Sequence, residues 1–115
     1  MIELQKHMGD NIPVAIEYLG CNEWAVRWDV SEIRSENMHG YEYYELKFNE
    51  RPTYGLFVSK LIRNKYSKDQ EEALKSNIIA EFMGGETNLD HESEWHQFQQ
   101  YREEVKVIGK NIFDI

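Results

Sequence analysis

The strongest hydrophobic pattern in this chain is an alternation of large apolar residues with polar or small residues from residue 23 to residue 30. The apolar positions are Trp24, Val26, Trp28 and Val30. Because side chains alternate between the two faces of a strand, this period of two predicts a β-strand with one buried face. A second alternating segment follows at residues 41–48, where Tyr44, Leu46 and Phe48 are in phase. The Asn-Met-His-Gly sequence between them predicts a hairpin turn.

The two alternating segments fit together only with an irregularity in their register. A four-residue loop pairs Ile33 with Tyr44, but the same register then places Val30 opposite Lys47. One extra residue in the first strand restores apolar pairs, because it re-phases the alternation. We therefore predict a β-bulge near residues 31–32. The pairs expected beyond it are Val30 with Leu46 and Trp28 with Phe48.

A shorter strand precedes this hairpin. Its apolar positions Val14, Ile16 and Tyr18 share one face, and a Gly-Cys-Asn turn leads from it into the tryptophan-rich strand. The sequence thus predicts a three-stranded antiparallel meander over residues 13–48. Residues 1–11 show only a hint of alternation, and we expect a mobile or edge segment there.

From Thr53 onward the hydrophobic period lengthens to about 3.6 residues, which predicts amphipathic helices. Thr53 itself suits the N-cap of a helix, and Ser67 with Gln70 has the spacing of a capping box. A Gly-Gly pair is expected to end the second helix, and Asn88 or Asp90 to cap the third. The three helices are expected to begin near Tyr54, Lys68 and Asp90.

A run of strands followed by a run of helices is typical of the α+β class. A chain of 115 residues can bury a core without disulfides or metals, so we expect a single α+β domain over residues 1–115. The strands of residues 13–48 should follow the chain order, and the helices of residues 53–112 should cover one face of the sheet. The side chains expected to be buried are Trp24, Val26, Trp28, Leu46, Phe48, Phe57, Leu61, Leu74, Ile78, Trp95 and Phe98.

The charge of the chain narrows the classes of partner. The formal net charge of −8 opposes a general affinity for nucleic acid or for an anionic membrane. No apolar run is long enough to cross a bilayer, and the first ten residues lack the pattern of a secretory signal. We therefore expect a soluble cytoplasmic protein that binds neither nucleic acid nor membrane.

The charges are also unevenly distributed. Basic residues gather at residues 60–68, the basic segment, and acidic residues at residues 86–104, the acidic segment. Together with Tyr41 and Tyr43 on the outer face of the sheet, these segments suggest a homodimer. The alternative is that both charged segments are simply solvated faces of helices.

The first two predicted helices form a helix-turn-helix-like hairpin next to the basic segment, which raises the possibility of DNA binding. A recognition helix needs basic or amide side chains near its N-terminus. The second helix has Asp69, Glu71 and Glu72 there, and phosphates would be repelled. The pattern therefore does not favour a DNA-binding protein.

No pattern indicates a catalytic, cofactor-binding or metal-binding residue, and we assign none. His91-Glu92 with His96 approaches the zinc-protease helix motif, but histidines five residues apart do not share a helix face. Cys21 is the only cysteine, so it has no partner for an internal disulfide. We expect a protein that is not an enzyme, and the alternative is a small enzyme without a local motif.

Residues 41–82 resemble small accessory proteins encoded among the tail and structural genes of phages and prophages. The matching features are the tyrosine-rich strand, Pro-Thr-Tyr at residues 52–54, and Leu-Ile-Arg-Asn-Lys-Tyr-Ser-Lys-Asp-Gln-Glu-Glu-Ala-Leu at residues 61–74. The resemblance implies a role in virion structure or assembly through protein–protein interaction. It implies no catalytic residue and no cofactor, and the tryptophan-rich strand lies outside it.

The acidic segment supports a second hypothesis that does not depend on this resemblance. A dense acidic surface from Asp90 to Glu104 could cover a basic protein such as a nuclease, as cytoplasmic inhibitors and immunity proteins do. The sequence therefore leaves two kinds of protein partner open: a structural or assembly protein, and a basic target of inhibition.

Overall fold

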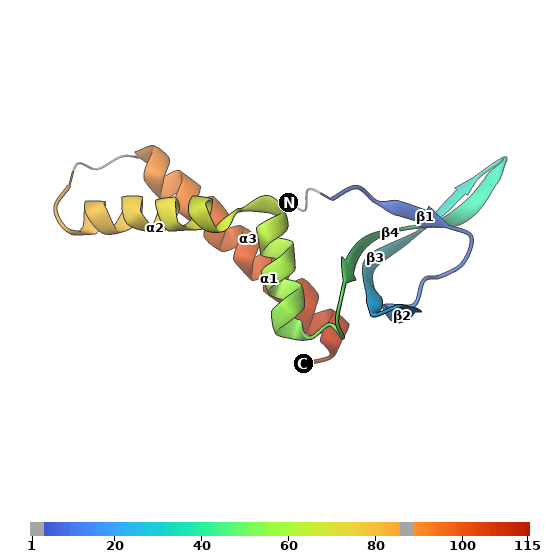
Figure 1. Cartoon of the computed structure of the whole chain (residues 1–115). Coiled ribbons are helices and arrows are strands. Elements are labelled where there is room, and N and C mark those ends of the chain that lie inside the picture. The colour runs from blue at the N-terminus through green and yellow to red at the C-terminus, as the bar shows by residue number, and fades with distance from the viewer. Residues whose placement is uncertain (1–3, 86–88) are drawn as a thin grey trace.

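The computed structural model describes residues 4–85 and 89–115. The elements in chain order are β1 (His7–Gly9), β2 (Ile16–Gly20), β3 (Glu23–Ser35), β4 (Met38–Phe48), α1 (Tyr54–Lys65), α2 (Lys68–Phe82) and α3 (Leu89–Phe113). The sheet lies at one end of the molecule, and α2 with the first half of α3 extends away from it as a helical arm (Figure 1). This confirms the α+β class and the three predicted helices.

The four strands form one antiparallel sheet in the order β1-β4-β3-β2. The strands β2, β3 and β4 are the predicted meander. These three strands follow the chain order as predicted, and the sheet has one strand more than expected, because β1 pairs with the free edge of β4 and places His7 opposite Tyr43. An open strand edge leaves backbone N–H and C=O groups unpaired, and β1 covers part of that edge. The N-terminal segment thus contributes an edge strand.

Residues 10–15 connect β1 to β2 across the face of the sheet that points away from the helices (Figure 1). Arg27 lies on this outer face, where its guanidinium donates to Glu17 Oε1 at 2.8 Å, to Glu45 Oε2 at 2.7 Å and to the carbonyl of Val14 at 3.3 Å. Burial disfavours the charged guanidinium, but the hydrogen bonds to the two carboxylates outweigh it and raise the pKa of Arg27. This ion-pair network ties three strands together on the outer face.

The turn between β3 and β4 has two residues, because Ser35 pairs directly with Met38. The four-residue loop predicted from Gly40 is wrong. Gly40 instead lies within β4, where it pairs with Ile33. A Cβ atom at Gly40 would lie 2.8 Å from the carbonyl oxygen of Gly9, so the glycine allows β1 to approach β4.

The predicted β-bulge in β3 is present, and it lies between Trp28 and Ser31. Asp29 has a φ of 56° there, in the left-handed region. Because the bulge comes earlier and the turn is shorter than predicted, the two expected pairs Val30–Leu46 and Trp28–Phe48 are wrong. The observed apolar pairs are Trp24 with Phe48, Val26 with Leu46 and Trp28 with Tyr44. The same face of each strand is nevertheless the buried one.

The helix ends follow the predicted capping signals. Thr53 Oγ1 accepts a hydrogen bond from the N–H of Leu56 at 3.3 Å, and Ser67 with Gln70 forms the complete capping box. Gly84, with a φ of 94°, follows the end of α2. For α3, Asp90 lies in the first turn rather than at the N-cap, and Asn88 lies outside the described residues.

The helices α1 and α2 do not pack along each other as a hairpin. A two-residue connection, Tyr66 and Ser67, joins them, and α2 then runs along the arm away from α1 (Figure 1). Instead, α3 packs against both of them. The long third helix is therefore the element that joins the arm to the rest of the molecule.

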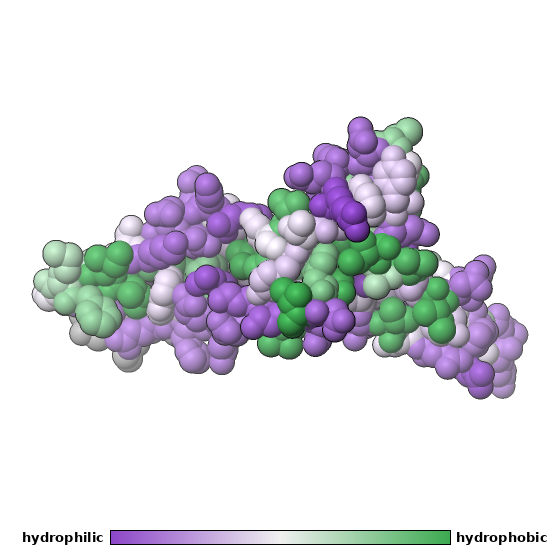
Figure 2. All heavy atoms as spheres, turned by 90° about the horizontal axis from the view of Figure 1, so that it is seen from below, coloured by the Kyte–Doolittle hydropathy of each residue, from purple (hydrophilic) through white to green (hydrophobic). Residues whose placement is uncertain are grey.

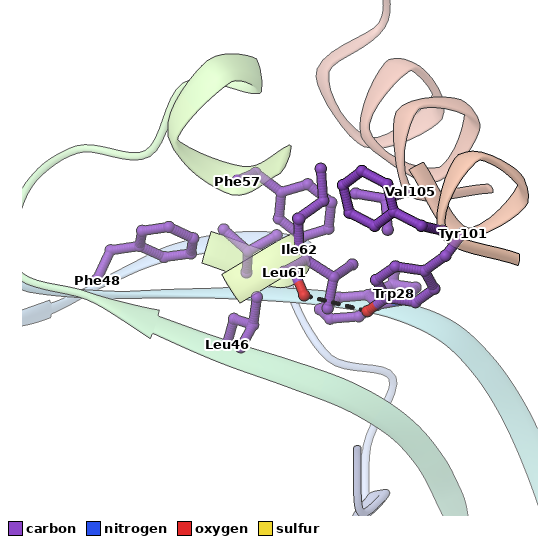
Figure 3. Close-up of a cluster of buried hydrophobic side chains, with 10 residues drawn as sticks. Trp28, Leu46, Phe48, Phe57, Leu61, Ile62, Tyr101 and Val105 are labelled. Atoms are coloured by element: carbon purple, nitrogen blue, oxygen red, sulfur yellow. Dashed lines mark hydrogen bonds between the residues drawn. The ribbon is translucent and has the colours of Figure 1, made fainter. Parts of the chain in front are cut away.

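The hydrophobic core lies where the sheet meets α1 and the middle of α3 (Figure 3). Its buried side chains are Val26, Trp28, Leu46, Phe48, Phe57, Leu61, Ile62, Phe98, Tyr101 and Val105. The ring of Phe57 meets that of Trp28 edge to face, with centroids 5.1 Å apart. The buried hydroxyl of Tyr101 donates to the carbonyl of Leu61 at 3.0 Å and so fixes α3 on α1.

Four side chains of the predicted core are only half-buried: Trp24, Leu74, Ile78 and Trp95. The last three belong to the arm, where α2 has no fully buried residue. Two helices alone cannot enclose a side chain on all sides, because a buried residue needs neighbours from several directions. The other seven predicted core residues are buried.

Gly109 lies inside α3, which continues to Phe113. We find that it marks a close helix contact. A Cβ atom at this position would lie 3.0 Å from two ring carbons of Tyr54 and 3.3 Å from Cγ2 of Val58. The missing side chain therefore lets α1 and α3 pack tightly.

The molecule is elongated. Its extents are 58 × 36 × 24 Å and its radius of gyration is 17.9 Å, whereas a compact domain of this length has a radius of about 13 Å. A shape of this kind leaves more side chains at the surface. None of the described helices, in residues 4–85 and 89–115, is long and apolar enough to cross a membrane.

Candidate functional site

The candidate site is an open groove between the sheet and the second half of α3, with a volume of about 700 Å³. Its lining residues are Trp28, Asp29, Tyr44, Glu103, Glu104, Val107, Ile108, Asn111 and Ile112. We call it the sheet–α3 groove. Pockets that bind ligands typically measure about 300–1,000 Å³, so the groove is large enough to hold a few side chains of a partner.

The floor of the groove is apolar. Trp28 and Tyr44 face each other across β3 and β4 with ring centroids 5.6 Å apart. On α3, Val107 and Ile108 lie one turn beyond the two glutamates of the lining. Val107, which also lines the groove, remains 58% exposed. The groove thus offers uncovered apolar surface.

The bulge in β3 brings Asp29 to the edge of the groove. Strict alternation would place Asp29 on the outer face of the sheet, together with Arg27. The two unpaired residues of the bulge and the left-handed φ of Asp29 interrupt that alternation, and the side chain lines the groove beside Trp28. Bulges commonly re-aim a side chain in this way.

A lysine ammonium already lies at the sheet end of the groove. Lys6 Nζ is 3.7 Å from Asp29 Oδ2 and 3.6 Å from Glu42 Oε1. The same atom lies 5.1 Å from the centroid of the Tyr44 ring. Two carboxylates and an aromatic face form a favourable environment for a cation, although each exposed pair contributes only about 0.2–1 kcal/mol.

The opposite rim is formed by two consecutive glutamates of α3. Glu103 Oε1 lies 3.3 Å from Lys106 Nζ, and the Glu103 side chain is 69% exposed. Glu104 is half-buried beside it. The charged side chains that line the groove are therefore all acidic, one from the sheet and two from the helix.

The indole of Trp28 carries a buried donor without an acceptor. Its Nε1 has no hydrogen-bond partner within the part of the chain that the structure describes, although the residue is more than nine-tenths buried. Leaving a buried donor unpaired costs about 1–3 kcal/mol, and native structures contain few such groups. This donor lies in a residue that lines the groove.

The structure separates the acidic segment into two parts. Glu92 and Glu94 belong to the arm, where Glu92 lies near Phe82 and Trp95. The other pair, at residues 103–104, is eleven residues further along α3, which is about 16 Å. The continuous acidic surface expected from the sequence is thus two surfaces, and only the second borders the groove.

The basic segment is largely engaged within the protein. Lys60 Nζ donates to the carbonyl of Lys47 and lies over the Phe48 ring. Arg63 Nη1 lies 3.1 Å from Glu71 Oε1, and Lys65 Nζ lies over the Tyr101 ring. The basic side chains on which the homodimer hypothesis depends thus already have contacts within their own chain.

The aromatic outer face is also partly covered. Tyr43 stacks on His7 of β1 with ring centroids 6.4 Å apart, and Tyr41 contacts the ring of His39 at 5.8 Å. Both tyrosines are half-buried. The sequence predicts residues 1–11 only as a mobile or edge segment, so the contact of His7 with Tyr43 is not predicted.

The histidines and the cysteine lie apart from one another. His91 Nδ1 is 3.5 Å from Glu81 Oε1 of α2, and His96 is exposed on α3. Within residues 4–85 and 89–115, no group of three potential metal-ligating side chains comes together. Cys21 is exposed in the turn between β2 and β3 with a φ of 53°.

A second exposed apolar surface lies at the far end of the arm (Figure 2). Its residues are Ile79, Phe82 and Met83, and Phe82 is 91% exposed. The pocket beside Phe82 has a volume of about 400 Å³, which is smaller than that of the sheet–α3 groove. The sheet–α3 groove combines apolar surface with charge of one sign and is the better candidate.

Sequence reasoning did not identify this groove. Alternation along the strand predicts Asp29 on the outer face of the sheet. Val107 lies outside the apolar stripe that the helical period of the third helix predicts, which consists of Trp95, Phe98, Tyr101, Val105, Ile108 and Ile112. The available signal was Val107 itself, an apolar residue between Lys106 and the stripe residue Ile108. Comparisons of the chain with protein-family models, with curated proteins and with solved structures found no match in any of the three.

Proposed function

We propose that this chain is a non-enzymatic protein-binding module that uses the sheet–α3 groove to hold a partner protein. The observation that carries the proposal is the uncovered apolar floor between two acidic rims. An aliphatic side chain of a partner would remove Val107 and its neighbours from water, which contributes about 25 cal/mol per Å² of apolar surface. The acidic rims would select the partner by charge.

The groove suits binding better than acid–base chemistry. Catalytic carboxylates depend on burial that changes their proton affinity. Here the side chain of Asp29 is 58% exposed and that of Glu103 is still more exposed. Both carboxylates are therefore well placed to attract a cation and poorly placed to act as a tuned acid or base.

We further propose that the partner is a structural or assembly protein of a phage or prophage, and that the chain acts in the host cytoplasm or in the virion. The resemblance of residues 41–82 supports this setting. That region now corresponds to β4, α1 and α2. The elongated arm, to which α2 belongs, has a shape suited to bridging neighbouring subunits.

A second candidate function is inhibition of a basic protein. The exposed carboxylates of Glu92 and Glu94 on the arm, together with the net charge of −8, favour it. In that case the arm, rather than the groove, would contact the target.

The test is to co-express the chain with the products of its neighbouring genes and to capture complexes by affinity and size-exclusion chromatography. We expect a tail, baseplate or fibre protein to bind the wild type, and Val107→Ser to weaken that binding. Ile79→Ser on the arm is the matched control. Capture of a basic toxin that is lost only with Glu92→Lys and Glu94→Lys would instead support the inhibitor function.

A further inference from the structure

We infer that the sheet–α3 groove recognises a short segment of a partner protein in which lysine or arginine alternates with aliphatic residues. The inference rests on the proposed function in assigning the groove to a protein partner. It goes further in naming the chemistry that the groove selects.

The rims favour a cation from both sides. Asp29 projects from the bulge of β3, and Glu103 and Glu104 project from α3 across the apolar floor. No basic side chain lines the groove among the described residues. A partner lysine or arginine above the floor would therefore meet carboxylates on either side, while an acidic segment or a nucleic acid would be repelled.

Lys6 shows how the sheet-side rim accommodates an ammonium group. It lies between the carboxylates of Asp29 and Glu42, with the Tyr44 ring within 5.1 Å. Since Asp29 and Tyr44 also line the groove, a partner cation would share these groups with Lys6. Lys6 thus reduces the local negative charge, and its removal should strengthen binding of a cationic segment.

The floor selects the aliphatic component. Val107, Ile108 and Ile112 supply branched side chains, and Trp28 supplies a flat aromatic surface. Trp28 also carries the buried N–H without an acceptor. Apolar contact and charge together distinguish this ligand from a purely basic tail.

The experiment is fluorescence anisotropy with the full chain and three labelled peptides at physiological ionic strength. The probe is Gly-Leu-Lys-Val-Lys-Leu-Gly. One control replaces both lysines by glutamate, and the other replaces leucine and valine by serine. We expect binding of the probe in the micromolar range, no binding of the glutamate peptide, and at least about fivefold weaker binding of the serine peptide.

Two double variants distinguish binding in the groove from a general attraction between the basic peptide and the acidic protein. Asp29→Asn with Glu103→Gln removes two charges from the rims, and Glu92→Gln with Glu94→Gln removes two from the arm. Asparagine tolerates the left-handed φ of position 29, so the bulge should persist. We expect the rim double variant to bind the probe about five- to tenfold more weakly than the wild type. The arm double variant should lose less than about twofold in affinity.

Two single changes test the floor and Lys6. Val107→Ser should weaken binding about three- to tenfold, while Ile79→Ser, at a similarly exposed position of 56%, should leave it unchanged. Lys6→Gln should strengthen binding about twofold. Circular dichroism of each variant checks that it is folded. Equal losses for the rim and arm pairs, or no effect of Val107→Ser, would overturn the inference.

The outcomes also separate this inference from the proposed function. If a phage structural protein binds the chain and that binding survives Asp29→Asn with Glu103→Gln, the proposed function stands and the assigned chemistry is wrong. If the lysine peptide binds as expected but no neighbouring gene product does, the chemistry stands and the proposed setting is wrong.

Discussion

The two ends of this molecule share one helix but are stabilised in different ways. At the sheet end, α3 lies against α1 and the sheet, and Phe98, Tyr101 and Val105 are buried from several sides. Along the arm, the same helix packs against α2, and Trp95 is half-buried. Both parts have an amphipathic pattern. The difference shows that the number of elements around a side chain, rather than its hydrophobic period, decides whether it is buried.

The arm depends more on local interactions. The capping box of Ser67 and Gln70 satisfies backbone donors at the start of α2. Glu71 links Arg63 of α1 to Lys75 one turn further along α2, at 3.1 and 2.9 Å. Caps contribute about 1 kcal/mol and partly exposed ion pairs less, so the arm should open at a lower free energy than the core.

The largest expected contrast comes from removing a phenyl ring at each end. Phe57→Ala should lower the free energy of unfolding by about 3–5 kcal/mol, because it leaves a cavity beside Trp28. Phe82→Ala at the arm should change it by less than about 0.5 kcal/mol. Urea unfolding measures both. Similar losses would mean that the arm belongs to the cooperative core.

Glycine-to-alanine changes test the contact between α1 and α3. Gly109→Ala places a Cβ atom 3.0 Å from the Tyr54 ring and should cost about 1–2 kcal/mol. A Cβ atom at position 55 would have no neighbour within 4 Å, so Gly55→Ala should stabilise α1 by up to about 1 kcal/mol. Thermal unfolding compares them. If both variants gain stability, the close helix contact is not a constraint.

A capping change should affect the arm alone. Ser67→Ala removes the acceptor for the Gln70 N–H and should cost about 1 kcal/mol, seen as faster amide hydrogen exchange in α2. Exchange in the sheet should stay the same. Ser76→Ala, in the middle of the same helix, is the control and should not accelerate exchange, because alanine favours helix. Faster exchange throughout the protein would contradict local opening.

The smallest expected effect is a pH dependence of the arm. Hydrogen bonds from Lys75 and Arg63 lower the pKa of Glu71. The folded pKa lies below the unfolded value of about 4.3, so this stabilisation is complete above that value and is lost as the pH falls through the folded pKa. We expect the free energy for opening the arm to fall by less than about 1 kcal/mol, since Arg63 and Lys75 are partly exposed.

The Glu71→Gln variant isolates that contribution. Its α2 amides should exchange faster than those of the wild type at neutral pH, and the two proteins should converge as the pH falls below about 4. Nuclear magnetic resonance provides both the exchange rates and the titration of Glu71. Equal α2 exchange in the wild type and in Glu71→Gln at neutral pH would show that the ion pairs contribute nothing.

The sequence by itself determined the local structure of this protein. Periods of 2 and 3.6 residues predicted the meander and the helices, and Thr53 and Ser67 predicted two helix starts, because caps and alternation depend on neighbouring residues only. The bulge was also predicted, since the apolar positions of one strand could not otherwise face the core. Each of these signals is contained within a few residues.

Only the tertiary structure decided the position of β1, the exact pairs and the groove. The pairing of His7 with Tyr43 and the approach of Asp29 to Glu103 join residues far apart in the chain, and no local period records such distances. The exposure of α2 likewise followed from how few elements surround it. Function belongs to this second group, because a binding groove is formed by surfaces that meet only after the chain has folded.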